Sequence, residues 1–376
     1  MSYLERKSIK TTEVMFQARD KLEKCLVGHL RFSEALGLIR NRIDFPLDSN
    51  LLFIVGPSGV GKSRLMVATQ KMVLQMHADE LNEDRSRLPY VAFDVQATNV
   101  GNFAWGPFYV DYLEQLQLPL APSKEILKEL PPTPRNHGPH KAVMSAIAHR
   151  RPLVTLLDEA NHLCQVSNAR LLPQQLDKIK SIANRSRTLH VMFGTYELAA
   201  LLDASPQLAR RSNTFHFSRY RCERQSDLNA FTEMIKGFGS CVPLHHTLDL
   251  KSRVELMYEK SIGCTGIVKN WLMAALGHAC RNNRDFITVQ DLEATAMQNQ
   301  KLRLLLSEAK EKESILDNCS SQNDSLREML NFPYIEQPEL PLKESKNRNA
   351  SPGTPNPRSD PTGGAFRDGE PEACAS

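Results

Sequence analysis

The sequence lacks a run of about 18 apolar residues, which is the length that a membrane-spanning helix needs. Its first residues, MSYLERKSIKTTEV, lack the apolar stretch of a secretory signal peptide. The eight cysteines stand apart without C-x-x-C spacing, a pattern that argues against a zinc site or a disulfide framework. These absences predict a cytoplasmic protein with reduced thiols and no membrane partner.

Internal repeats are also absent, and neither sign of charge dominates, because 376 residues carry a net charge of only +4. With 41% hydrophobic and 24% charged residues, the chain has the balance of a globular protein of two or three units. The charge is unevenly spread: residues 141–224 hold 13 Lys or Arg against 6 Asp or Glu. Such an excess attracts polyanions, although a solvated basic face would give the same count.

The stretch LLFIVGPSGVGKSRLM, at 51–66, is the strongest signal that the sequence does contain. An apolar strand leads into a glycine-rich loop, whose backbone amides and following helix start favour bound phosphate. Lys62 is expected to reach the β- and γ-phosphates, and Ser63 to place its hydroxyl on Mg²⁺. The residues expected to contact ATP are Gly56, Pro57, Ser58, Gly59, Val60, Gly61, Lys62, Ser63 and Arg64.

A second signal is LVTLLDEA, an apolar strand that ends in two adjacent carboxylates. Alternation along a strand sends Asp158 and Glu159 in different directions. Asp158 is expected to help hold Mg²⁺, and Glu159 to polarise the attacking water, a division that suits phosphoryl transfer.

Alternating strands and helices predict an α/β fold with a parallel sheet covered by helices on both faces. The expected strands lie within LLFIV, YVAFDV, PLVTLLDEANHL and LHVMFGTYEL. From about residue 220 the periodicity is helical only, with Thr288 as the expected N-cap of a last helix at 288–312. Beyond about residue 332, proline, glycine, serine and asparagine dominate.

The expected organisation follows from these shifts in pattern. It comprises an N-terminal helical segment (1–45), a P-loop ATPase core (46–219), a helical lid (220–300), a helical extension (301–332) and a disordered tail (333–376).

GPSGVGKS, LLDEAN, the strand ending in FGTYEL and the helical C-terminal part together resemble an AAA+ ATPase. Within that superfamily, SPQLARRSNTFHF and GCTGIVKNWLMAAL make the chain most similar to transposition ATPases of the TnsC/TniB type. The resemblance covers roughly residues 10–300. It implies the AAA+ fold, ATP and Mg²⁺ as cofactors, and ATP hydrolysis.

The resemblance also implies roles for further residues. Thr195 matches the position that senses the γ-phosphate, and Arg210 or Arg211 matches the arginine finger offered to a neighbouring subunit. Lys269 is the candidate basic sensor of the lid, although relatives more often carry Arg there.

The family implies further that the chain oligomerises on double-stranded DNA as a hexamer-like ring or a helical filament, selects target sites and recruits a transposase together with target-selector proteins. Hydrolysis would then disassemble the oligomer. The candidate DNA contacts, which would grip the phosphate backbone, are Lys178, Lys180, Arg185, Arg187 and the loop QATNVGN.

Two alternatives remain open at this stage. One is another AAA+ role on DNA, as a replication initiator or helicase loader, although no winged-helix pattern follows residue 300. The other is a nucleotide-gated adaptor with little turnover, which the intact Asp158–Glu159 pair disfavours. No LSGGQ-like signature of a transporter ATPase is present.

Overall fold

The computed structural model describes residues 3–25, 30–47, 49–97, 103–116, 137–166, 172–199 and 212–317. The predicted tail, the arginine pair at 210–211 and most of the loop at 96–102 lie outside these residues. All described elements belong to one of two compact units, Met1–Cys319. Within the described part of the chain, no helix has the length and apolar character to cross a membrane.

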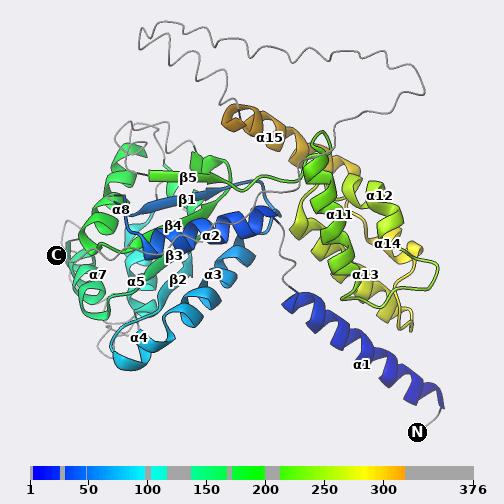
Figure 1. Ribbon diagram of the computed structural model, residues 1–376. Helices are drawn as coiled ribbons and strands as arrows, with labels where there is room; N and C mark the ends of the chain where they lie inside the picture. The colour runs from blue at the N-terminus through cyan, green and yellow to red at the C-terminus, as the bar shows by residue number, and fades with distance from the viewer. Residues whose placement is uncertain are drawn as a thin grey trace, which may run out of the picture. The chain divides into compact units, whose positions relative to one another are not determined.

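The described strands form one parallel sheet in the order β2-β3-β4-β1-β5 (Figure 1). The strands are β1 (Leu51–Val55), β2 (Tyr90–Asp94), β3 (Val154–Asp158), β4 (Leu189–Gly194) and β5 (Ser212–His216). Val55 pairs with Gly194, and Leu157 with Met192, so β1, β3 and β4 end at the same edge of the sheet. Ligands of open parallel sheets bind outside this carboxyl edge.

Helices cover both faces of the sheet, as the alternating strand pattern predicts (Figure 1). One face packs Leu52 and Ile54 against α2 (Leu30–Asp44) and α3 (Lys62–Met76). The other packs Phe53 and Val55 against a core to which α5 (Trp105–Gln115), α7 (His137–Arg150) and α8 (Leu172–Ser186) contribute. A short α4 (Ala78–Glu83) precedes β2.

The strand β5 was not among the predicted strands. Its sequence, SNTFH, is polar and lies at the edge of the sheet, so it lacks the apolar run of a strand buried on both faces. Parallel pairing with β1, in which Phe53 lies opposite Thr214, holds β5 at the edge of the sheet.

The helical lid consists of α11 (Gln225–Gly239), η3 (Lys251–Arg253), α12 (Val254–Glu259), α13 (Thr265–Arg281) and α14 (Val289–Thr295). The first helix of the chain, α1 (Tyr3–Lys24), packs Met15, Ala18 and Leu22 into the same hydrophobic core as these helices. The N-terminal segment is thus shared: α1 packs with the lid, whereas α2 packs with the sheet.

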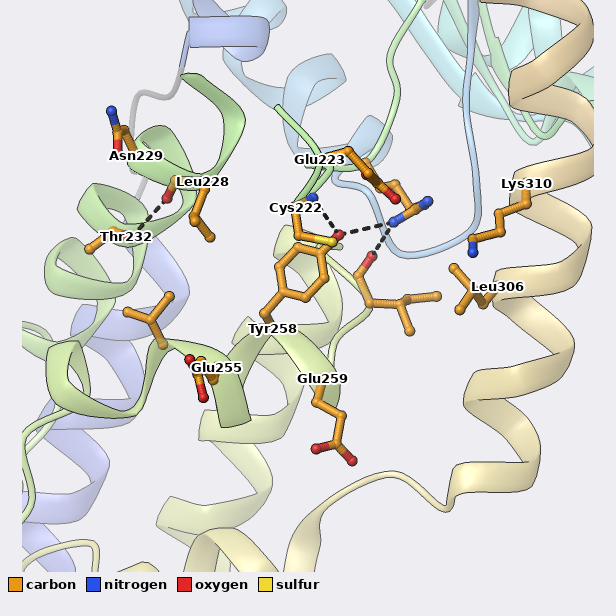
Figure 2. A pocket seen from close by; sticks show the side chains of 13 residues that line it. Cys222, Glu223, Leu228, Asn229, Thr232, Glu255, Tyr258, Glu259, Leu306 and Lys310 are labelled. Carbon is orange, nitrogen blue, oxygen red and sulfur yellow. Dashed lines mark hydrogen bonds between the residues drawn. The ribbon is translucent and has the colours of Figure 1, made fainter. Parts of the chain in front are cut away.

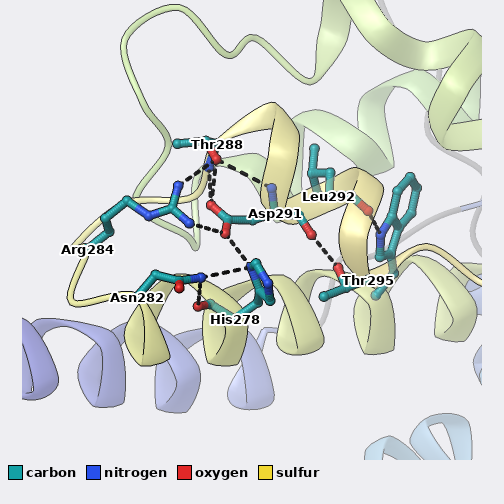
Figure 3. A network of polar contacts seen from close by, with 8 residues as sticks. His278, Asn282, Arg284, Thr288, Asp291, Leu292 and Thr295 are labelled. Carbon is teal, nitrogen blue, oxygen red and sulfur yellow. Dashed lines mark hydrogen bonds and ion pairs between the residues drawn. The ribbon is translucent and has the colours of Figure 1, made fainter.

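A buried carboxylate organises the end of the lid (Figure 3). Asp291 accepts hydrogen bonds from the Thr288 backbone and hydroxyl at 2.8 and 2.6 Å, which completes a capping box and confirms Thr288 as the N-cap. His278 and Arg284 each lie 2.6 Å from Asp291 Oδ1. Burial would raise the pKa of Asp291, but these bonds and the Arg284 charge hold it below the ordinary value.

The prediction of a single helix at 288–312 is wrong in one respect, because two separate helices form there. The α14 helix ends at Thr295, Ala296 is extended, and α15 (Asn299–Asp317) begins three residues later. Leu302 of α15 packs against lid residues, whereas Ala309 packs in the core of the sheet, so α15 contacts both parts.

Candidate nucleotide site

The glycine-rich loop leaves β1 at the carboxyl edge of the sheet and ends at the first residue of α3. Gly59 and Gly61 have φ values of +77° and +112°, which suit only glycine without strain. A Cβ on Gly56 would lie 2.1 Å from the Phe217 carbonyl oxygen. The loop therefore needs these three glycines for its path, and α3 presents its N-terminus to the same edge.

Lys62, the first residue of α3, is buried beneath the loop. Its Nζ donates to the carbonyl oxygens of Gly56 and Pro57, each at 2.9 Å. Burial lowers the pKa of this ammonium group, and the charges of Asp158 and Glu159 oppose that shift. The phosphate loop and the acidic pair thus lie close enough to interact electrostatically.

The two adjacent carboxylates have different environments, but strand alternation is not the cause, because β3 ends at Asp158. Asp158 is 4% exposed, and its Oδ1 accepts a hydrogen bond from the Glu159 amide at 2.9 Å. Glu159 is exposed and has a φ of +50°, an unusual conformation for a residue with a side chain. Strain of this kind is common at functional positions.

A hydroxyl with no partner lies at the end of the neighbouring strand. Thr195 directly follows β4, and its Oγ1 is buried without a hydrogen-bond partner among the described residues. The Thr195 amide donates to Asn161 Oδ1 at 3.3 Å. Asn161 was not predicted as a site residue, although its place two residues after Glu159, in LLDEAN, was available from the sequence. It connects the exits of β3 and β4.

The lid contacts the phosphate loop through the start of α13. The Gly266 amide donates to the Gly59 carbonyl at 2.7 Å, and Thr265 Oγ1 donates to the Val60 carbonyl at 2.5 Å. A Cβ on Gly266 would lie 2.6 Å from the Gly59 oxygen. Only the lysine of GCTGIVKN was predicted as a site residue, whereas Thr265 and Gly266 of the same segment contact the loop.

Lys269, the predicted lid sensor, is directed elsewhere. Its Nζ donates to the carbonyls of Glu23 and Cys25 at 2.9 and 3.1 Å, at the C-terminal end of α1. A lysine is favoured there because the last carbonyls of a helix carry partial negative charge. In this conformation Lys269 joins α1 to the lid, and the sensor role stays a prediction.

The predicted DNA-contacting side chains on and after α8 are not equally accessible. Lys178, Arg185 and Arg187 are exposed, and Lys178 Nζ lies 5.0 Å from the centre of the Trp105 ring. Lys180 is only 9% exposed and lies 3.5 Å from Asp177. Its burial does not suit a phosphate contact. Arg210, Arg211 and most of QATNVGN lie outside the described residues.

The residues present fit a magnesium–triphosphate. Asp158 and the exposed Ser63 offer the hard oxygen atoms that Mg²⁺ prefers, and Mg²⁺ commonly takes only one or two protein ligands beside phosphates. The Thr195 hydroxyl, which has no hydrogen-bond partner among the described residues, offers a donor or an acceptor to the triphosphate. Loop, acidic pair and sheet order together define an AAA+ P-loop fold.

Comparisons with known proteins agree with this class. Residues 47–202 match the family model of the AAA domain, which supports an ATPase in general. A search of curated proteins returned no match. Structures with a similar fold include ORC1 of Aeropyrum pernix in complex with DNA, at 13% identity and a TM-score of 0.51, covering 74% of this chain and 68% of that one.

Two further structures resemble the chain less closely in shape. ORC2 of Aeropyrum pernix in its ADP form has 16% identity and a TM-score of 0.48, covering 74% of this chain and 71% of that one. Drosophila ORC bound to DNA has 16% identity and a TM-score of 0.44, covering 75% and 65%.

Proposed function

We propose that this chain is an ATP-hydrolysing AAA+ switch that assembles on duplex DNA. The observation that carries the proposal is the sheet edge where Lys62, the Asp158–Glu159 pair and the Thr195 hydroxyl, which lacks a hydrogen-bond partner within the described part of the chain, lie together. Two observations support DNA as the binding partner. Basic side chains are exposed at the end of α8, and the ORC1 structure of similar fold was solved in complex with DNA.

The proposed division of labour follows from these positions. Lys62 would exchange its two carbonyl acceptors for phosphate oxygens, and Glu159 would orient the attacking water and accept its proton. Bound Mg²⁺ would neutralise charge on the phosphates. Thr195 would bond the γ-phosphate or the water, and an arginine at 210 or 211 would complete a neighbour's site, so that hydrolysis requires an oligomer.

We further propose that the biological task is regulation of transposition: ATP-bound subunits select a target on DNA and recruit a transposase with its target selector. The lid and strand motifs that resemble TnsC/TniB ATPases support this role. A replication initiator or helicase loader is the second candidate, favoured by the ORC1 likeness. Binding that persists against excess DNA of unrelated sequence would favour the initiator, because sequence-indifferent backbone binding is competed away equally by any DNA.

Glu159→Gln tests the hydrolytic role. We expect this variant to bind ATP like the parent, to lose hydrolysis by at least about 100-fold, and to remain on duplex DNA after the parent has dissociated. Calorimetry, phosphate release and electron microscopy with ATP, ADP or a non-hydrolysable analogue measure these steps. Equal hydrolysis and DNA retention in parent and variant would remove the role given to Glu159. Monomers under every nucleotide would remove the assembly proposal.

A further inference from the structure

A carboxylate from α15 lies buried between two arginines that follow the sheet. Glu313 is 4% exposed, and its oxygens lie 3.2 Å from Arg219 Nε and 3.5 Å from Arg221 Nε. Both arginines belong to the segment that joins β5 to α11, the connection between sheet and lid. Buried charges are costly unless paired, so this cluster fixes α15 to that connection.

Arg219 extends the same connection to the turn before α13. Its Nη1 donates to the Ile262 carbonyl at 3.3 Å and to the Tyr258 hydroxyl at 3.1 Å. The Cys222 amide also donates to this hydroxyl, at 3.0 Å. Both residues line a cleft of about 700 Å³, and Figure 2 shows Leu306 and Lys310 of α15 on its facing side. One guanidinium thus contacts both α15 and the turn.

The turn has little freedom to move without its neighbours. Gly263 has a φ of +77°, its carbonyl accepts from the Tyr220 amide at 3.0 Å, and a Cβ there would lie 2.2 Å from the Tyr220 oxygen. Two and three residues further along the chain, Thr265 and Gly266 form hydrogen bonds to the phosphate loop. An unbroken series of contacts therefore runs from Glu313 through Arg219 and the turn to Val60.

Packing and charge also place α15 close to the phosphate loop at the carboxyl edge of the sheet. Leu302 packs with Ile262 and Ile267, and the Ile267 side chain lies over Gly59. Burial raises the pKa of Tyr196, the neighbour of Thr195, and the charge of Glu313 raises it further. The charge of Glu308 also acts on Lys62.

We propose that Glu313 is a positioning residue for the nucleotide loop: it holds Arg219, which holds the 262–266 turn and keeps α13 seated on Gly59 and Val60. The inference rests on the proposed function and adds that α15 controls how fast nucleotide leaves. Glu313 itself does not touch the reacting atoms; it acts through Arg219.

Glu313→Gln is the direct test. Without its counter-charge, Arg219 holds the turn less firmly and the lid contact loosens. We expect fluorescently labelled ADP to dissociate about tenfold faster and KM for ATP to rise similarly, a coupling of ordinary size between linked sites, with kcat changed less than about twofold. The matched control is Glu311→Gln on the same helix, whose side chain is 69% exposed and pairs with the adjacent Lys312.

A double-variant cycle tests whether the effect travels through the turn. Thr265→Val removes the hydroxyl that bonds the phosphate loop, at the other end of the series of contacts from Glu313. Adding Glu313→Gln to this variant should accelerate ADP release little further. Fully additive effects would overturn the proposal. If Glu313→Gln fails to fold, the double variant Glu313→Gln/Arg219→Gln replaces it, because it removes both charges of the closer pair. The same measurement of ADP release then tests the proposal.

The outcomes separate this inference from the proposed function. Absence of ADP and ATP binding by the parent in calorimetry would overturn the proposed function, and this inference with it. Binding by the parent combined with equal ADP release from Glu313→Gln and Glu311→Gln would overturn this inference alone.

Discussion

Thr195 offers a test of the nucleotide site at the scale of one hydroxyl group. Its Oγ1 is buried with no hydrogen-bond partner among the described residues, so the folded protein gains nothing from it. We therefore expect Thr195→Val to leave the melting temperature unchanged or to raise it slightly. ATP hydrolysis should fall by about tenfold or more, because the group serves the nucleotide and not the fold. Calorimetric melting and phosphate release measure the two effects.

Thr155→Val is the matched control, because it is the same substitution at a hydroxyl that has a partner. Thr155 Oγ1 lies 2.6 Å from the Tyr112 hydroxyl, which is fully buried. Removing it should cost about 1–2 kcal/mol of unfolding free energy. Loss of stability in Thr195→Val comparable to that in Thr155→Val would show that Thr195 has a structural role.

Sequence patterns specify candidate site residues where chemistry constrains the local chain, but not where tertiary packing decides the contacts of a side chain. Lys62 and Asp158 could be placed because a phosphate loop and a strand-end carboxylate are local patterns. Lys269 shows the limit: the family resemblance implies a sensor role, which stays a prediction, but the sequence did not indicate that its hydrogen-bond acceptors lie at the C-terminus of α1, more than 240 residues away in the chain. No single-sequence rule reveals such a pairing.

At the scale of elements, Gly266 tests the contact between lid and loop. Alanine normally favours a helix, but at Gly266 its Cβ would lie 2.6 Å from the Gly59 oxygen. We expect Gly266→Ala to displace α13 and to weaken ATP binding by about tenfold, a typical coupling between packed elements. Titration calorimetry measures the affinity.

Gly277→Ala, on the same helix, is the control for this substitution. A Cβ there meets nothing within 4 Å, so the variant should bind ATP like the parent and gain up to about 1 kcal/mol of stability from helix propensity. Unchanged ATP affinity in a folded Gly266→Ala would mean that the lid contact is not needed for binding.

Asp291 makes the lid sensitive to acid. Its pKa in the folded protein lies below the ordinary 3.8, so its contribution to stability is complete above pH 3.8 and is lost as the pH falls through the folded-state value. Asp291→Asn should be less stable at neutral pH by about 1–3 kcal/mol and should lack this part of the acid dependence. Urea unfolding over a series of pH values, from neutral to well below 3.8, measures both.

The exposed Asp285, in the loop before α14, is the control, and Asp285→Asn should retain the acid dependence of the parent. Parallel acid profiles for Asp291→Asn and the parent would mean that another carboxylate governs acid unfolding.

Helices and strands could be predicted from the sequence where their apolar residues repeat regularly. The buried strands and α3 follow from such apolar patterns. The polar strand β5 does not, because its formation depends on backbone pairing with β1. The assignment of α1 to the lid core depends on contacts between Leu22 and residues more than 200 positions later, which amphipathicity alone does not specify. The domain boundaries accordingly stay predictions.

At the scale of the whole molecule, the exposed arginines at the end of α8 predict salt-dependent DNA binding. If Arg185 and Arg187 each neutralise one phosphate, Arg185→Gln/Arg187→Gln should lower the slope of log affinity against log salt by about 2, since each phosphate contact contributes about 0.9. The loss should be similar for duplexes of unrelated sequence, because backbone contacts carry no base readout. Fluorescence anisotropy with ATP analogue present measures the slopes.

Lys301→Gln/Arg303→Gln on α15 removes the same net charge from another exposed surface and is the matched control for this DNA prediction. If Arg185 and Arg187 contact phosphates directly, only Arg185→Gln/Arg187→Gln should lower the slope of log affinity against log salt by about 2. Equal slope changes in the two double variants would show that net charge alone drives binding. An unchanged slope in the α8 pair would place the DNA surface elsewhere. The proposal for the nucleotide site would stand, because Arg185 lies on α8 and Arg187 directly after it, and neither belongs to that site.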